Sequence, residues 1–132
     1  MKILVTGGCG FIGYHLVKHL VHGNQVTVVD NCSQPPKFVP QAYYRIMDIN
    51  DIDIIYEKFD IIYHLAAIST ITECYFDPKK AIDTNIKGTV SILNKAANDE
   101  SRFIFASTCA IYGGDLSLYS TSSSDRATLF QP

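Results

Sequence analysis

Glycines fill the turn after the first apolar run of the chain, and their spacing suits a phosphate-binding loop. Residues 6–13 read Thr-Gly-Gly-Cys-Gly-Phe-Ile-Gly, which fits G-x-x-G-x-x-G from Gly7 and G-x-G-x-x-G from Gly8. One glycine would permit the tight turn, one would let a pyrophosphate approach the backbone, and Gly13 would let the next helix pack closely. Free amides at the helix start would face the phosphates. The loop predicts a dinucleotide site, and an ordinary glycine-rich turn is the alternative.

An acidic residue follows where the ribose of a dinucleotide requires one. Asp30 ends the apolar run 25–30, about twenty residues beyond the glycines. Its carboxylate can accept both ribose hydroxyls of an adenosine, whereas the 2′-phosphate of NADP would meet like charge. No basic residue follows before Lys37, so the expected cofactor is NAD. The alternative is that Asp30 is only a turn residue at a strand end.

The elements that must position these residues alternate between strand and helix. Apolar, β-branched runs predict strands over residues 2–6, 25–30, 43–47, 61–66 and 103–106. Apolar residues at helical spacing predict helices over residues 11–22, 49–59 and 78–97. Such alternation implies a parallel sheet with right-handed crossovers. The expected fold is α/β, a Rossmann-type doubly wound parallel sheet truncated after about five strands.

Composition limits the class of protein. The chain has 132 residues, 47% of them hydrophobic and 18% charged, with a formal net charge of −2. One globular domain is expected, and without a concentrated basic surface neither nucleic acid nor an anionic membrane is an expected partner. No signal peptide or membrane span is visible, so a cytoplasmic protein is expected. We expect the domain to cover residues 1–114 and the Ser/Thr-rich residues 115–132 to form a flexible tail.

Other reactive side chains form weaker patterns. The cysteines at 9, 32, 74 and 109 include no Cys-x-x-Cys pair, so no metal ligand set and no disulfide framework is expected. Three histidines at 15, 19 and 22 share one helix face without a carboxylate, and solvated histidines are commoner than a metal site. His64 is expected to be a packing residue rather than a general base. Cys109 could be a nucleophile only beside a base, and none lies in register.

Together, the glycine loop, Asp30 and the later segments resemble the NAD-dependent epimerase/dehydratase family of extended short-chain dehydrogenases/reductases over residues 1–114. The resemblance implies that residues 6–13 bind phosphate, that the segment 64–67 lines the cofactor, and that Thr108 is the catalytic Ser/Thr that hydrogen-bonds the sugar hydroxyl being oxidised. The implied cofactor contacts are Gly7, Gly10, Phe11, Ile12, Gly13, Asp30, Asn31, Asp48, Ile49, Leu65, Ala66, Ala67, Asn85 and Ser107.

The general base of that family is missing from the sequence. The resemblance places a Tyr-x-x-x-Lys motif roughly twenty residues beyond Tyr112, but Tyr119 is followed four residues later by Ser123 and no lysine follows Lys95. We therefore expect the NAD-binding part of a nucleotide-sugar epimerase or dehydratase, inactive by itself. Alternatives are a non-catalytic NAD(H)-binding module or regulatory partner, and a domain that pairs with a full-length relative. The open sheet edge and uncovered apolar helix surface also predict marginal stability, aggregation or a homo-oligomer.

Overall fold

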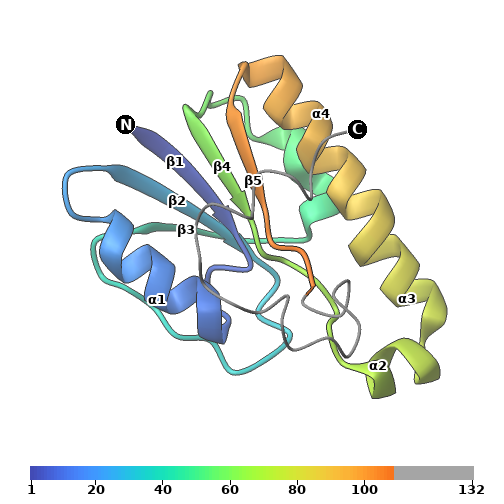
Figure 1. Ribbon diagram of the computed structural model, residues 1–132. Helices are drawn as coiled ribbons and strands as arrows, with labels where there is room; N and C mark the ends of the chain where they lie inside the picture. Colours follow the sequence, from blue (N-terminus) through green and yellow to red (C-terminus); the bar gives the residue numbers. More distant parts are fainter. Residues whose placement is uncertain (109–132) are drawn as a thin grey trace, which may run out of the picture.

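The computed structural model describes residues 1–108, and these form one parallel sheet with helices on both faces (Figure 1). The strands are β1 (Lys2–Thr6), β2 (Gln25–Asp30), β3 (Tyr43–Ile46), β4 (Ile61–His64) and β5 (Arg102–Phe105). Their order is β3-β2-β1-β4-β5, and every neighbouring pair is parallel. The expected doubly wound α/β fold is confirmed. The chain reverses its direction of winding between β1 and β4, which is where such folds bind ligands.

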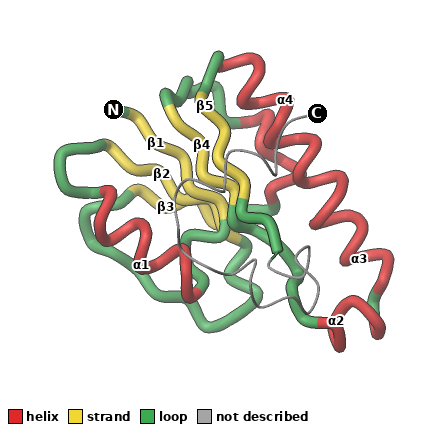
Figure 2. Tube along the Cα trace, viewed as in Figure 1, coloured by secondary structure: helices red, strands yellow, loops and turns green. Residues whose placement is uncertain are grey.

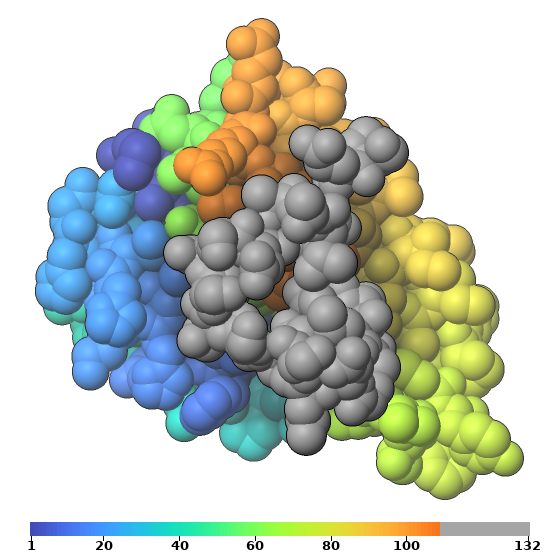
Figure 3. Space-filling view, in the orientation of Figure 1, coloured from blue at the N-terminus to red at the C-terminus, as the bar shows by residue number. Residues whose placement is uncertain are grey.

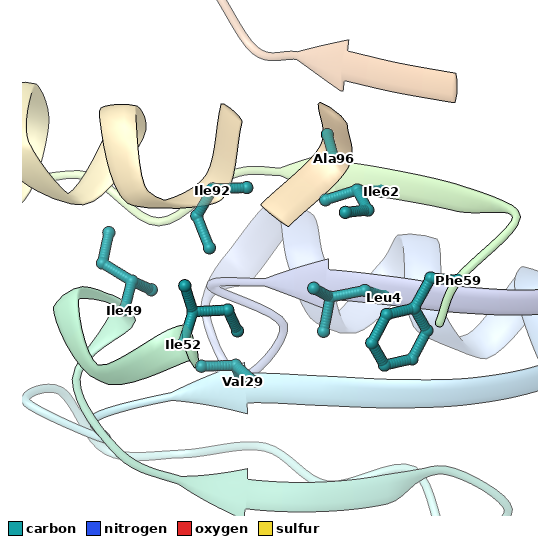
Figure 4. Packing of buried hydrophobic residues seen from close by; sticks show 8 residues of the cluster. All are labelled: Leu4, Val29, Ile49, Ile52, Phe59, Ile62, Ile92 and Ala96. Atoms are coloured by element: carbon teal, nitrogen blue, oxygen red, sulfur yellow. The ribbon is translucent and has the colours of Figure 1, made fainter. Parts of the chain in front are cut away.

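Two apolar cores flank the sheet because successive strand residues point to opposite faces. Ile3 and Val5 of β1 pack toward α1 (Phe11–Leu20), whereas Leu4 packs toward the other side. We call the second cluster the α4-side core, after the helix α4 (Thr89–Asp99) that covers it. Its members are Leu4, Val29, Ile49, Ile52, Phe59, Ile62, Ile92 and Ala96 (Figure 4). Figure 3 shows α1 on one side of the molecule and the α3–α4 region on the other.

The prediction of a helix over residues 49–59 is wrong after Ile54. A 3-10 helix, η1 (Ile49–Ile54), is followed by Ile55 in an extended conformation. Three hydrogen bonds to the C-terminal end of α4 compete with helix formation. The Phe59 amide donates to Asp99 (3.2 Å), the Ser101 hydroxyl to the Phe59 carbonyl (2.6 Å), and Lys95 to the Glu57 carbonyl (2.7 Å). They hold residues 57–59 out of a helix while Phe59 enters the α4-side core.

The helix expected over residues 78–97 is continuous but irregular. It comprises α3 (Pro78–Ile82), a π-helical turn η2 (Asp83–Gly88) and α4. The π turn brings Gly88 against η1, since a Cβ on Gly88 would lie 2.3 Å from Cδ1 of Ile49. A further helix, α2 (Ile71–Phe76), was not expected. It begins with the Thr-x-x-Glu sequence of a capping box, in which the Thr70 hydroxyl accepts from the Glu73 amide at 3.3 Å and donates to the Glu73 carboxylate at 2.5 Å.

The remaining boundaries agree with expectation to within two residues at each strand end, and α1 ends at Leu20 instead of residue 22. No helix within residues 1–108 is long and apolar enough to cross a membrane. The expected flexible tail, 115–132, lies outside the described residues.

Burial should make one of two otherwise similar ion pairs important for stability. Lys95 and Asp99 are 7% and 4% exposed and 2.7 Å apart, whereas Lys87 and Asp83 form an i,i+4 pair that is 66% and 34% exposed. Asp99→Ala leaves a buried ammonium and the Phe59 amide without their carboxylate, and should cost about 3 kcal/mol of unfolding free energy. Asp83→Ala should cost much less, because water screens that pair. Urea denaturation of both variants measures the difference, and equal shifts in midpoint would contradict this account.

Candidate functional site

Three loops meet at the carboxyl edge of the sheet, which Figure 2 shows as the convergence of the loops that follow the strands. The Gly7 amide donates to the Val29 carbonyl at 2.9 Å, and the Leu65 amide donates to the Thr6 carbonyl at 3.1 Å. These bonds continue the parallel ladders one residue beyond the ends of β1 and β4. The glycine loop therefore lies between the segment after β2 and the segment after β4.

Contacts within the described part of the chain require glycine at three positions of the loop, but not at Gly10. Gly7 has a φ of +71°, and a Cβ there would lie 2.7 Å from the Ala66 nitrogen. A Cβ on Gly13 would lie 2.1 Å from the Gly7 carbonyl oxygen, and one on Gly8 would lie 2.5 Å from Val28. At Gly10, by contrast, the nearest atom within residues 1–108 is 3.4 Å away and the backbone is extended. The described part of the chain therefore leaves space at Gly10, as a pyrophosphate requires.

The N-terminus of α1 is suited to an anion. The first hydrogen bond of the helix runs from the Tyr14 amide to the Gly10 carbonyl at 2.9 Å. The amides of Phe11, Ile12 and Gly13 have no hydrogen-bond partner among residues 1–108. The first turn carries no acidic residue, so the positive end of the helix dipole is not neutralised locally. Phe11 and Ile12 are 76% and 66% exposed, which leaves this end of the helix accessible.

Asp30 is held at the centre of the site by two backbone amides. One carboxylate oxygen accepts from the Cys9 amide at 2.9 Å, and the other accepts from the Cys32 amide at 2.8 Å. The carboxylate thus ties the glycine loop to the loop after β2. Each oxygen retains capacity for a second hydrogen bond, so two ribose hydroxyls could still be accepted. Asn31 is exposed, and its side chain accepts from the Ser33 amide at 3.1 Å.

A buried polar chain fixes the loop after β4. The Thr89 hydroxyl donates to the Asn85 carbonyl at 2.7 Å, so its oxygen accepts from Nε2 of His64 at 3.0 Å. Nδ1 of His64 then accepts from the Thr6 hydroxyl at 2.6 Å, and Thr6 in turn accepts from the Leu65 and Ala66 amides, both at 3.3 Å. This order of donors assigns His64 as the neutral tautomer protonated on Nε2. Its place in the network is that of a positioning residue.

Asn85 secures the same loop from the π turn. Its side-chain oxygen accepts from the Ile68 amide and its NH₂ group donates to the Ile68 carbonyl, both at 2.8 Å. The amide side chain thereby replaces a strand partner for one residue of the β4 loop. Ala67 is exposed beside it, while Leu65 and Ala66 are half-buried. A direct contact of these residues with the cofactor stays a prediction.

The remaining expected site residues lie on either side of this centre. Asp48 caps η1 by accepting from the Asn50 amide at 2.9 Å, and Ile49 is buried in the α4-side core at 5% exposure. Both follow β3, next to β2 at the same sheet edge. Ser107 and Thr108 follow β5 and are exposed. Cys109 and Tyr112, which the sequence analysis also considered, lie outside the described residues.

The sequence did not predict the part that the Thr6 and Thr89 hydroxyls play in this network, although Thr6 belongs to the expected phosphate loop. A polar residue at the end of an otherwise apolar strand was a usable signal for Thr6, because a buried hydroxyl needs partners. Thr89 had no comparable signal, since threonine is ordinary on a helix surface. Only the packing of α4 against β4 brings its hydroxyl to His64.

The burial of His64 predicts a loss of stability in mild acid. Burial lowers its pKa from 6.5 to about 4, so the unfolded chain takes up a proton first as the pH falls. The stabilisation is complete above pH 6.5 and is lost as the pH falls to about 4, amounting to about 3 kcal/mol. Unfolding free energy measured by urea denaturation across this range should fall more steeply for the wild type than for His64→Gln. Parallel curves for the two proteins would disprove the assignment.

Comparison with known proteins places this geometry in a family. Residues 3–131 match the model of the NAD dependent epimerase/dehydratase family. UDP-N-acetyl-alpha-D-glucosaminuronate decarboxylase of Bacillus cytotoxicus is 36% identical over 121 residues, which cover 85% of this chain and 38% of that protein. This chain thus spans well under half the length of this relative.

Solved structures agree with this assignment. UDP-glucose 4-epimerase of Thermotoga maritima, solved with UDP-glucose, superposes with a TM-score of 0.79 at 34% identity, over 88% of this chain and 41% of that one. The Thermus thermophilus UDP-glucose 4-epimerase complex with NAD superposes with a TM-score of 0.74 at 29% identity, over 82% of this chain and 38% of that one. The expectation of NAD as cofactor is confirmed at the level of the family. The chain belongs to the NAD-dependent epimerase/dehydratase family.

Proposed function

We propose that these residues are the NAD-binding portion of an enzyme that acts on a nucleotide sugar, as an epimerase, dehydratase or decarboxylase. The observation that carries the proposal is the hydrogen bond from the Cys9 amide to Asp30, 2.9 Å long. It holds the ribose-binding carboxylate beside the phosphate-binding loop, so both parts of an adenosine diphosphate would meet their partners together. The names of the related decarboxylase and epimerases support the substrate class.

Each part of the dinucleotide would have its own set of residues. The amides of Phe11, Ile12 and Gly13 would bind the pyrophosphate, with Gly10 leaving room for it. Asp30 and Asn31 would bind the adenosine ribose, and Asp48 and Ile49 would flank the adenine. The nicotinamide half would lie along the segment 65–67, with Asn85 and Ser107 nearby.

When bound, NAD supplies a hydride acceptor for oxidation of a sugar carbon. Thr108 would hydrogen-bond the hydroxyl that is oxidised. No Tyr-x-x-x-Lys pair to take the proton follows Tyr112 in these 132 residues, since the last lysine is Lys95. We therefore propose that this chain by itself binds NAD without turnover, and that catalysis needs residues from elsewhere. A non-catalytic NAD(H)-binding module would share every residue named above.

Calorimetric titration of the 132-residue chain tests the cofactor site. NAD should bind saturably and NADP at least tenfold more weakly, because the 2′-phosphate would face the Asp30 carboxylate. Asp30→Asn should weaken NAD binding by about tenfold and reduce the preference over NADP. Gly10→Ala should fold normally, given its extended backbone and open surroundings, yet bind NAD at least tenfold more weakly. The proposal fails if the folded chain binds neither nucleotide, or binds NADP as tightly as NAD.

An exposed apolar stripe supports the expected homo-oligomer. Ile82, Ile86, Val90 and Leu93 are each between 44% and 59% exposed along the helix from α3 to α4. Burying such a stripe against a second copy would remove it from water.

Light scattering should therefore give a mass above that of one chain. Val90→Asp should lower this mass toward the monomer, because it places a charge within the stripe. The charge-matched control Asn98→Asp, at the exposed end of α4, should leave it unchanged. A monomeric wild type at all concentrations would refute self-association.

A further inference from the structure

Two cysteines far apart in the sequence lie together beside Asp30. The sulfur atoms of Cys9 and Cys32, 23 positions apart, are separated by 3.9 Å. One ligand atom from each of Cys9, Asp30 and Cys32 can be chosen so that all three lie within 4.8 Å of one another. Within residues 1–108 this is the one group of three or more His, Cys, Asp or Glu side chains close enough to hold a metal ion.

The separation of the sulfurs fits a shared metal ion better than a disulfide. Two Zn–S bonds of about 2.3 Å at a tetrahedral angle place the sulfurs about 3.8 Å apart. A disulfide would require them to approach to about 2.05 Å. The observed 3.9 Å therefore matches one edge of a tetrahedral zinc site with almost no movement of either thiol.

The backbone around Asp30 holds this arrangement in place. The carboxylate accepts from the amides of both cysteines, at 2.9 Å from Cys9 and 2.8 Å from Cys32. Cys32 has a φ of +53°, a left-handed conformation that is uncommon for a residue with a side chain. Each carboxylate oxygen still has a lone pair for a cation. Cys9 is buried and Cys32 is half-buried, so the group is reached from the side of Cys32.

We propose that Cys9, Cys32 and Asp30 bind a thiophilic divalent cation of the zinc or cadmium type, with the fourth position open to water or a ligand. The sequence had predicted no metal ligand set, because neither cysteine has a second one nearby in the chain. Since Asp30 is also the proposed ribose ligand, the cation and NAD compete for one carboxylate. The competition with NAD rests on the proposed function, whereas the binding of the cation does not.

Charge and protonation set the conditions for binding. Two thiolates and a carboxylate place three formal negative charges around the cation, which favours a divalent ion. A thiol must lose its proton to bind the cation, so the affinity should rise with pH.

Cadmium titration of the 132-residue chain, in a buffer with a non-thiol reductant, tests the site. Cadmium–thiolate bonds give an ultraviolet charge-transfer band, which should saturate at one equivalent. Cys9→Ser and Cys32→Ser should each reduce the band and weaken binding at least tenfold, and Asp30→Asn should weaken it less. Cys74→Ser, which removes a half-buried cysteine outside the group, should leave it unchanged. Far-ultraviolet circular dichroism checks that each variant is folded.

Persistence of the full band in both Cys9→Ser and Cys32→Ser, or its loss in Cys74→Ser, would overturn the site. Competition is measured separately, by titrating NAD with and without saturating zinc. NAD binding should weaken at least tenfold with zinc, recover on chelation, and be unaffected by zinc in Cys32→Ser. Unchanged NAD affinity in the presence of bound zinc would overturn the competition. A chain that binds cadmium but never NAD would refute the proposed function and leave the metal site standing.

Discussion

Close contact between main chains at the end of β1 is the constraint on which the site depends. Gly7 lies against the backbone of Leu65 and Ala66, and Gly13 lies against the carbonyl of Gly7, with no room for a Cβ at either position. Because three segments meet without intervening side chains, α1 starts immediately above the sheet edge. Its first amides then face outward at the point where the winding of the sheet reverses. The direction of the helix dipole and the place of Asp30 both follow from this contact.

Buried polar side chains also fix the segments that meet at the site. Thr6, His64, Thr89 and Asn85 form a chain of hydrogen bonds that joins β1, β4, α4 and the loop at Ile68. No side-chain nitrogen or oxygen buried within the described residues lacks a hydrogen-bond partner. A second ring proton, on Nδ1, would displace the hydrogen bond that this nitrogen accepts from the Thr6 hydroxyl. The low pKa of His64 is the consequence of its burial.

The other side of the sheet shows how tertiary contacts override local preference. Residues 55–59 have the apolar spacing of a helix, but Lys95, Asp99 and Ser101 supply hydrogen-bond partners for an extended backbone. At the end of the π turn Gly88 lies against Ile49, and the absence of a Cβ there lets α4 approach η1 closely. Phe59 reaches the α4-side core from the extended segment. The π turn before α4 and the early end of η1 thus both accompany the close packing of α4 against η1.

The sequence by itself determined the order of the strands, the place of α1 and of the helix from α3 to α4, the glycine loop, the acid at the end of β2 and the choice of NAD. These features are encoded within short stretches, where side-chain period and glycine spacing act directly on the local backbone. Even α2 had a local signal, the Thr70–Glu73 capping box, that was not used. Tertiary structure alone decided that Gly10 is the loop glycine not required by packing, that Asn85 binds the Ile68 backbone, and that Cys9 and Cys32 flank Asp30. Each of these depends on atoms brought together from distant positions, and no periodicity along the chain records such distances.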